Sequence, residues 1–294
     1  MNDNKNNSGF TLIEMSIVLV IIGLIVGGIL VGQDLIAAAA IRAQISQIER
    51  YNTAVNTFRN KYGYLPGDIP DPQASSFGFA ARGVYAGEGD GNGIIEGIYS
   101  SNAAGHNVGV MLSAGETAMF WVDLATANLI DGAFNTATSI APVSGSGSTI
   151  DLYMPNAKIG SGNYIYDYSF NGINYYGISS NLVFVAGWNP SSTPGLTVQQ
   201  AYNIDKKIDD GLPQSGSVTA QYDNHNQNTL LAAWAAGGGL QGANSGGPYH
   251  VATTSATPYA TTNCYDNGGN TGTQQYSTAQ NATAVNCALS FKFQ

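Results

Sequence analysis

The chain has 294 residues and a formal net charge of −9, and only 10% of its residues are charged. Beyond Tyr62 it holds fifteen acidic and five basic residues, so this distal part is strongly acidic. An acidic surface repels a phosphate backbone, which argues against nucleic-acid binding, whereas it can attract cations.

An apolar segment begins close to the N-terminus. From Met15 to Val31, 12 of 17 residues are Ile, Leu or Val, and no charged residue lies between Glu14 and Asp34. At about 1.5 Å per residue, residues 10–33 are long enough to cross the core of a bilayer. A helix at the surface of a soluble protein core shows a polar face, and this segment has none. The sequence therefore predicts a membrane-spanning helix over residues 10–33.

A cleaved secretory signal and a plain membrane anchor are the alternative interpretations of this segment. The run Ala37–Ala40 supplies the small residues that a signal peptidase needs. However, the apolar stretch is too long for a signal, Asp34 separates it from the alanines, and Met1–Ser8 carries one Lys against one Asp rather than a basic start. A plain anchor explains the apolar run but not the residues just before it.

Those preceding residues form a recognisable order: Gly9, Phe10, Thr11, Leu12, Ile13 and Glu14. This G-F-T-L-I-E order resembles the cleavage and methylation motif of type IV prepilins and type II secretion pseudopilins. The resemblance implies a leader over residues 1–9, cleavage after Gly9 on the cytoplasmic side, and N-methylation of Phe10. It also implies that the apolar segment is retained in the mature chain.

The resemblance implies a structural subunit of a type IV pilus or a type II secretion pseudopilus, and the large head points to a minor subunit. The expected partners are a prepilin peptidase, other pilin or pseudopilin subunits in a helical filament, and an inner-membrane assembly platform. The expected location is the bacterial inner membrane, crossed once, with the head in the periplasm and later in the filament. The alternative is a pilin-like anchor that displays an adhesive or ligand-binding head.

The chemistry of the motif residues fits these roles. Gly9 has no side chain, so a peptidase can approach its backbone closely. Glu14 places a carboxylate at the edge of an apolar span, which is costly unless the carboxylate is paired. The α-ammonium of a neighbouring subunit would be a suitable partner and would set the register of an assembling filament. The alternative is a glutamate that only reaches the membrane interface.

Helical periodicity continues over residues 34–63 as one apolar stripe, with its residues three or four positions apart. Its members are Ile41, Ile45, Ile48, Tyr51, Val55, Phe58 and Tyr62. The residues expected off the stripe are Arg42, Gln44, Gln47 and Arg50. We expect the helix to stop near Gly63, because Pro66 hinders its continuation. The expected arrangement is one long helix, half in lipid and half docked on a head formed by residues 64–294.

The head is expected to add helices and a small antiparallel sheet, which makes the fold class α+β. Capping boxes at Ser113 with Glu116, and at Thr197 with Gln200, predict helices over Ala118–Ile130 and up to Gly211. A hairpin is predicted at Asn171-Gly172. The expected strands are Tyr164–Phe170, Ile173–Ile178, Leu182–Ala186 and Ala288–Phe293.

An acidic, glycine-rich segment resembles the first half of an EF-hand calcium loop. Oxygen ligands would come from Glu88, Asp90, Asn92, the carbonyl of Ile94, and Glu96, with Gly93 at the sixth position. Position 12 is Tyr99 and not the usual bidentate Glu, so a complete calcium site would need a carboxylate from elsewhere. The alternative is an acidic turn without a metal.

Two cysteines lie near the C-terminus, Cys264 and Cys287. In an exported protein they would form one disulfide, whereas two free thiols would suit a cytosolic one. Enzyme signatures are absent from the sequence: there is no G-x-S-x-G and no P-loop, and the three histidines are scattered. We therefore expect a protein that is not an enzyme.

Overall fold

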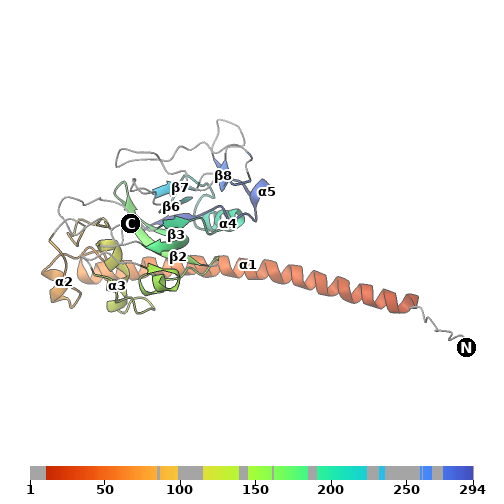
Figure 1. The fold of residues 1–294 in the computed structure, drawn as a ribbon, viewed down its shortest axis with the longest axis horizontal. Helices are drawn as coiled ribbons and strands as arrows, with labels where there is room; N and C mark the ends of the chain where they lie inside the picture. The colour runs from red at the N-terminus through yellow and green to blue at the C-terminus, as the bar shows by residue number, and fades with distance from the viewer. Residues whose placement is uncertain are drawn as a thin grey trace, which may run out of the picture.

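In the computed structural model, one long helix projects from a head that is built around its C-terminal half (Figure 1). The structure describes residues 11–84, 87–98, 115–138, 145–160, 162–184, 191–223, 232–235, 259, 261–266 and 274–293. Gly9, Phe10, Ser113 and Tyr99 lie outside these residues, so the predictions made for them remain predictions.

The described residues combine helices with short strands. The helices are α1 (Leu12–Tyr62), α2 (Gln73–Ser76), α3 (Glu116–Thr126), the 3-10 helix η1 (Gly147–Leu152), α4 (Val198–Ile208) and α5 (Thr278–Asn281). The longer strands are β2 (Asn163–Phe170), β3 (Ile173–Phe184) and β10 (Leu289–Lys292). The short strands are β1 (Gly145–Ser146), β4 (Ser191–Thr193), β5 (Val218–Thr219), β6 (Gln221–Asp223), β7 (Ala232–Trp234), β8 (Tyr265–Asp266) and β9 (Gln275–Tyr276).

Helix α1 is continuous over 51 residues, with a defined start and end. Thr11 and Glu14 form a capping box that satisfies amide groups at its first turn. Gly63 ends it in the left-handed conformation with φ of 81°, which glycine adopts without a steric penalty. The predicted long helix and its end at Gly63 are therefore confirmed.

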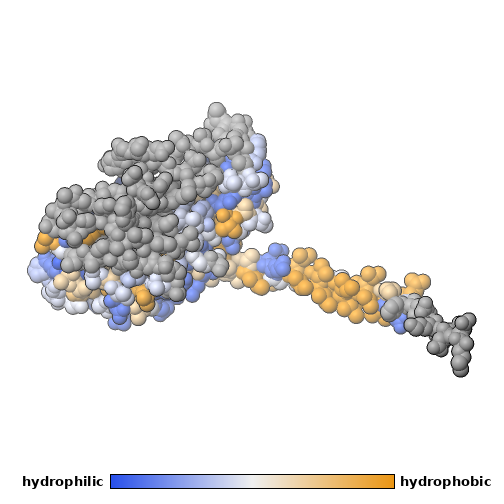
Figure 2. Space-filling model, viewed as in Figure 1, coloured by the Kyte–Doolittle hydropathy of each residue, from blue (hydrophilic) through white to orange (hydrophobic). Residues whose placement is uncertain are grey.

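The two halves of α1 have different surroundings. From Leu12 to Ile36 its large apolar side chains are exposed, and they form the apolar arm in Figure 2. From Ile41 onward one face of α1 is buried in the head, and Phe58 is completely covered. The predicted apolar stripe is confirmed.

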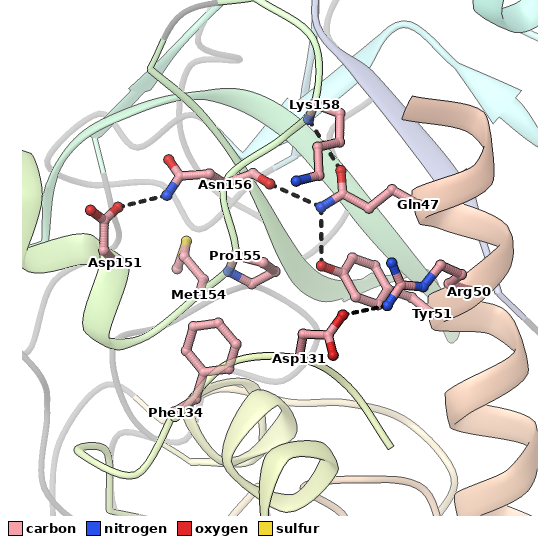
Figure 3. Close-up of a pocket in the computed structure, with 10 residues that line it drawn as sticks. All are labelled: Gln47, Arg50, Tyr51, Asp131, Phe134, Asp151, Met154, Pro155, Asn156 and Lys158. Carbon is pink, nitrogen blue, oxygen red and sulfur yellow. Dashed lines mark hydrogen bonds and ion pairs between the residues drawn. The ribbon is translucent and has the colours of Figure 1, made fainter. Parts of the chain in front are cut away.

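Gln44 and Gln47 are expected off the apolar stripe, yet both side chains are buried against the head. The carbonyl oxygens of their amides accept the backbone N–H of Lys158, at 2.7 Å and 3.1 Å respectively. Gln47 Nε2 also donates to the carbonyl oxygen of Asn156 at 2.9 Å (Figure 3). The buried face of α1 is therefore wider than the apolar stripe. It includes these glutamines because their amides form hydrogen bonds with the backbone of the segment at Asn156 and Lys158.

A six-stranded sheet stands on this half of α1, and β3 is its central strand. β3 pairs antiparallel with β1, β2, β4 and β10, and β10 pairs with β5. Figure 1 shows α1 and α3 on one side of the sheet and β6 and β7 on the other. Since both sides are covered, every residue of β2 is buried.

Aromatic side chains fill the space between the sheet and the helices. Tyr51 of α1 meets Trp121 of α3 edge to face at 5.0 Å between ring centroids. Tyr176 of β3 stacks on Phe293 at 4.1 Å. Such pairs bury a large apolar area and fix the relative orientation of the elements that carry them.

The predicted head elements are largely confirmed. The hairpin at Asn171-Gly172 joins β2 and β3, and Thr197 with Gln200 caps α4. The helix predicted over Ala118–Ile130 runs over Glu116–Thr126 and begins at Gly115 without a side-chain cap. The third predicted strand is not separate, because Leu182–Phe184 continues β3. The α+β architecture agrees with a pilin fold.

One carboxyl group in the described core is buried without a hydrogen-bond partner. Asp167 of β2 is fully buried, and neither carboxylate oxygen has a partner in hydrogen-bond geometry within the described structure. Burial raises its pKa well above the ordinary value, and the nearby indole of Trp121 offsets this only in part. The neutral acid is therefore the form that the core favours.

Replacement of Phe58 by Ala should lower the free energy of unfolding by about 3–5 kcal/mol, because it opens a cavity where the head meets α1. The Phe58 ring lies 4.7 Å from that of Tyr62 and 5.3 Å from that of Phe79. Chemical unfolding of the full chain in detergent measures the loss. Asn60→Ala on the exposed face of α1 is the control, and an equal loss there would contradict this packing.

Asp167→Asn should change the pH dependence of stability. Because the folded-state pKa lies above the unfolded one, the wild-type stability is fully present below about pH 4 and declines as the pH rises toward the folded-state pKa. The variant should lack this decline, which amounts to at most about 1.4 kcal/mol per pH unit for one proton.

Unfolding at pH 4, 6 and 8 checks this expectation. The difference in unfolding free energy between Asp167→Asn and wild type should grow in favour of the variant as the pH rises. Asp131→Asn, at an exposed position, controls for the loss of one negative charge from the chain. Parallel curves for wild type and Asp167→Asn would show that the buried carboxyl does not titrate in this range.

Candidate functional site

The N-terminal arm of α1 is one candidate site. Within the described residues, α1 is the one helix long and apolar enough to cross a membrane, and none of its most apolar stretch is buried in the head. A lipid-exposed segment must satisfy its own backbone groups, and a continuous α-helix does so. The arm can therefore lie in a bilayer or against apolar helices of other subunits.

Glu14 sits at the start of this arm, where the sequence places it. Its Oε2 atom accepts the backbone N–H of Thr11 at 2.8 Å and the Thr11 hydroxyl at 2.9 Å. Both bonds end on the same oxygen, so Oε1 is able to accept from a second donor. The carboxylate thus closes the first turn of α1 and still offers an acceptor close to the predicted cleavage junction.

The acidic loop over residues 88–96 is a second candidate site. Asp90 Oδ1 accepts the backbone N–H of Asn92 at 3.0 Å, and Asn92 Oδ1 accepts that of Ile94 at 2.7 Å. Gly89, which has a φ of 106°, passes so close to the Ile69 carbonyl that a Cβ atom would lie 2.6 Å from it. The loop is therefore held tightly, with Asp90 on its exposed side.

Two buried carboxylates from outside the loop hold it in place. Asp68 accepts the backbone N–H groups of Gly91 at 2.7 Å and Gly93 at 2.8 Å. Glu116, the first residue of α3, accepts the N–H of Gly89 at 3.1 Å and that of Glu96 at 2.8 Å. Sequence reasoning missed both acids, because nothing in their local sequence places them against loop residues that are twenty or more positions away.

The structure brings Asp90 together with these two acids. One carboxylate oxygen each from Asp68, Asp90 and Glu116 lies within 4.8 Å of the others. Of the ligands expected from sequence, Asp90 belongs to this group, whereas the carboxylate of Glu88 lies against the backbone of Gly83. The incomplete calcium loop would need a carboxylate from elsewhere in the chain, and two candidates, Asp68 and Glu116, lie next to Asp90.

Burial, and then repulsion between neighbouring carboxylates, disfavours the charged forms of these acids. Burial, with a further contribution from Asp90, raises the pKa of Asp68 to about 6. Burial and then Asp90 raise the pKa of Glu96 to about 7. Burial and then Asp68 raise the pKa of Glu116 well above its ordinary value. A cation with a preference for oxygen ligands would relieve this repulsion.

A second group of acidic residues, Asp205, Asp209 and Asp210, lies at the end of α4. Their carboxylates accept hydrogen bonds from the turn that follows the helix. Asp205 accepts the Gly211 N–H at 3.0 Å and the Tyr276 hydroxyl at 2.8 Å. Asp210 accepts the Leu212 N–H at 2.8 Å. These contacts hold the segment that follows α4 and give it a fixed shape.

The two cysteines form a disulfide, as predicted. Cys264 and Cys287 are fully buried, with their Cα atoms 4.9 Å apart. Leu196, just before α4, exchanges backbone hydrogen bonds with Cys287, so the covalent link is tied to that helix. A closed loop of this size contributes about 3 kcal/mol to stability in the chain-entropy account.

Comparison with known families bears on the N-terminal arm. Residues 4–30 match the model of the prokaryotic N-terminal methylation motif. The chain carries a prepilin signature. No curated protein and no solved structure matches the chain. The match covers Gly9, Phe10 and Glu14 together with most of the exposed apolar arm, and it is the signature of type IV pilins and pseudopilins.

The prepilin signature and the apolar arm together fit a pilin-like subunit that is processed and anchored in the inner membrane. They point to a structural subunit rather than an enzyme. They also imply a prepilin peptidase and other pilins as partners.

Proposed function

We propose that this chain is a minor structural subunit of a type IV pilus or a type II secretion pseudopilus. The observation that carries the proposal is the prepilin motif over residues 4–30, which runs into a 51-residue helix whose first half is largely apolar and exposed. A prepilin peptidase removes residues 1–9, and the arm over 10–33 inserts in the inner membrane and then in the filament. Residues 34–63 link it to the periplasmic head over residues 64–294.

Glu14 directs assembly in this proposal. Cleavage after Gly9 creates an α-ammonium at Phe10, which becomes N-methylated. The free Oε1 of Glu14 can accept from the ammonium of a neighbouring subunit while Oε2 keeps its bonds to Thr11. In an apolar filament core the attraction between opposite charges is much stronger than in water. Pairing of the Glu14 carboxylate with the ammonium would therefore hold an incoming subunit in place.

Processing and assembly should separate genetically. Gly9→Val should abolish cleavage, because a branched side chain blocks close approach of the peptidase to the backbone. Glu14→Val should be cleaved normally but should lose filament incorporation by at least about tenfold, the factor that corresponds to about 1.4 kcal/mol. Intact mass and N-terminal sequencing measure processing, and the shear fraction of cells measures incorporation.

Asp34→Val is the matched control, since it removes a different carboxylate from the same helix, just beyond the arm. A mature chain that starts at methylated Phe10 only when the peptidase is present supports the proposal. A chain that still starts at Met1 in the presence of an active peptidase would leave a simple anchor, and one cut after Ala40 would make it a secreted protein.

We also propose that the acidic loop binds Ca²⁺. The loop places oxygen ligands on alternate residues, and Asp68 and Glu116 bring two further carboxylates to Asp90. Asn92 and Glu96 complete the oxygen-rich surroundings. Bound calcium would neutralise the buried acids and hold the loop against α3, so its role would be to stabilise the head.

Addition of 1 mM Ca²⁺ to EDTA-treated full-length protein should raise Tm by several degrees, because a ligand that binds only the folded state stabilises it. Asp90→Ala should remove this response, because it deletes one of the three grouped carboxylates. Since Asp90 is exposed, the replacement should have little effect on folding. Asp131→Ala, at another exposed position, should keep it. An equal Tm with Ca²⁺ and with EDTA in the wild type would sink the calcium proposal.

A further inference from the structure

The sequence contains three Asn-Gly pairs, Asn92-Gly93, Asn171-Gly172 and Asn267-Gly268, and the last lies outside the described residues. In such a pair the backbone nitrogen of the glycine can attack the side-chain amide carbon of the asparagine, because glycine has no side chain to hinder the approach. Both described pairs are exposed, so access to water does not distinguish them. They differ in how the fold holds the glycine N–H.

The pair Asn171-Gly172 is the turn of the hairpin that joins β2 to β3. Its φ angles are 52° at Asn171 and 74° at Gly172, and two positive values are typical of a type I′ turn. Within the described part of the chain, neither the Gly172 N–H nor the side-chain amide of Asn171 forms a hydrogen bond. The peptide group between the two residues is therefore not held by any contact.

This turn can reach the geometry that the reaction needs. Rotation of the peptide plane between Asn171 and Gly172 converts a type I′ turn into a type II′ turn, with ψ of about −120° at the first residue and φ of about −80° at the second. Glycine accepts either sign of φ. At that ψ the Gly172 nitrogen eclipses Cβ of Asn171 and faces its amide carbon. The rotation breaks no hydrogen bond, because the Gly172 N–H has no partner to lose.

The pair Asn92-Gly93 is held on both sides of the same bond. The Gly93 N–H donates to Asp68 Oδ2 at 2.8 Å. Asn92 Oδ1 accepts the N–H of Ile94 at 2.7 Å, and Asn92 Nδ2 donates to Asp90 at 3.1 Å. Rotation of this peptide plane would take a donor away from the buried carboxylate of Asp68, which is costly. The fold therefore keeps the Gly93 nitrogen away from the amide carbon of Asn92.

We propose that Asn171 is a site of spontaneous deamidation on the head, whereas the fold protects Asn92. The Gly172 nitrogen gives its proton to hydroxide and bonds to Cγ of Asn171. The bond between Cγ and Nδ2 then breaks, and the side-chain nitrogen takes a proton from water and leaves as ammonia. Water opens the resulting imide ring at either carbonyl carbon, which leaves aspartate or isoaspartate at position 171. No oxidant or reductant takes part.

The two products differ in their effect on the hairpin. Each adds one negative charge to a head that is already acidic. Aspartate tolerates a positive φ, so it leaves the turn intact. Isoaspartate adds one atom to the main chain of a two-residue turn, which loosens the register between β2 and β3. This inference is independent of the filament function, and each can fail without the other.

Peptide mapping by mass spectrometry tests the proposal on the full-length chain, incubated in detergent with EDTA at pH 9 and 37 °C. Trypsin separates the two pairs, because Lys158 lies between them. In the folded chain Asn171 should be converted at least about tenfold faster than Asn92, the factor that corresponds to about 1.4 kcal/mol of activation free energy. In concentrated urea this difference should disappear, because the contact between Gly93 and Asp68 is then lost.

Equal rates at the two sites in the folded chain would overturn the proposal. So would an unmodified Asn171 in the folded chain after the unfolded chain has been fully converted. Asp68→Ala removes the acceptor of the Gly93 N–H, so it should speed the conversion of Asn92 and leave the rate at Asn171 unchanged. Isoaspartate-specific enzymatic methylation of the Asn171 peptide identifies the second product, and its absence from the converted peptide would rule out the imide route.

Discussion

The structure depends on one constraint: a single unbroken helix has to suit two different environments. The first half of α1 exposes a long run of apolar side chains that water solvates poorly, whereas the second half is buried along one face by the head. Because the helix satisfies its own backbone from Leu12 to Tyr62, no loop is needed at the boundary. The position of the arm therefore fixes the position of the head.

Buried polar groups, more than a large sheet, hold the irregular parts of the head to this helix. Gln44 and Gln47 fasten the segment at Lys158, and Asp68 and Glu116 fasten the acidic loop. The same logic applies to a buried ion pair, in which Arg82 Nη2 lies 2.6 Å from Asp123 and a second bond from Gly67 N–H satisfies the carboxylate at 2.7 Å. A head with so few charged residues thus places several of them inside, where an unpaired group is most costly.

Features encoded within one turn or one repeat could be predicted from the sequence. The stripe on α1, the cap at Thr197 and the Asn171-Gly172 hairpin each depend on residues a few positions apart, and the structure has them. The burial of Gln44 and the proximity of Asp68 to Glu116 depend on segments that are distant in the chain, so no local sequence pattern predicts them. The placement of β10 beside β3 is non-local in the same way.

Glu14 links the chemistry of processing to the geometry of the helix. Its carboxylate already caps the first turn of α1 through Thr11, close to the predicted cleavage junction. Cleavage would place a positive charge beside that cap without disturbing it, because the bonds to Thr11 use one oxygen and leave the other free. The helix would then present an ordered acceptor and a new cation at the same end.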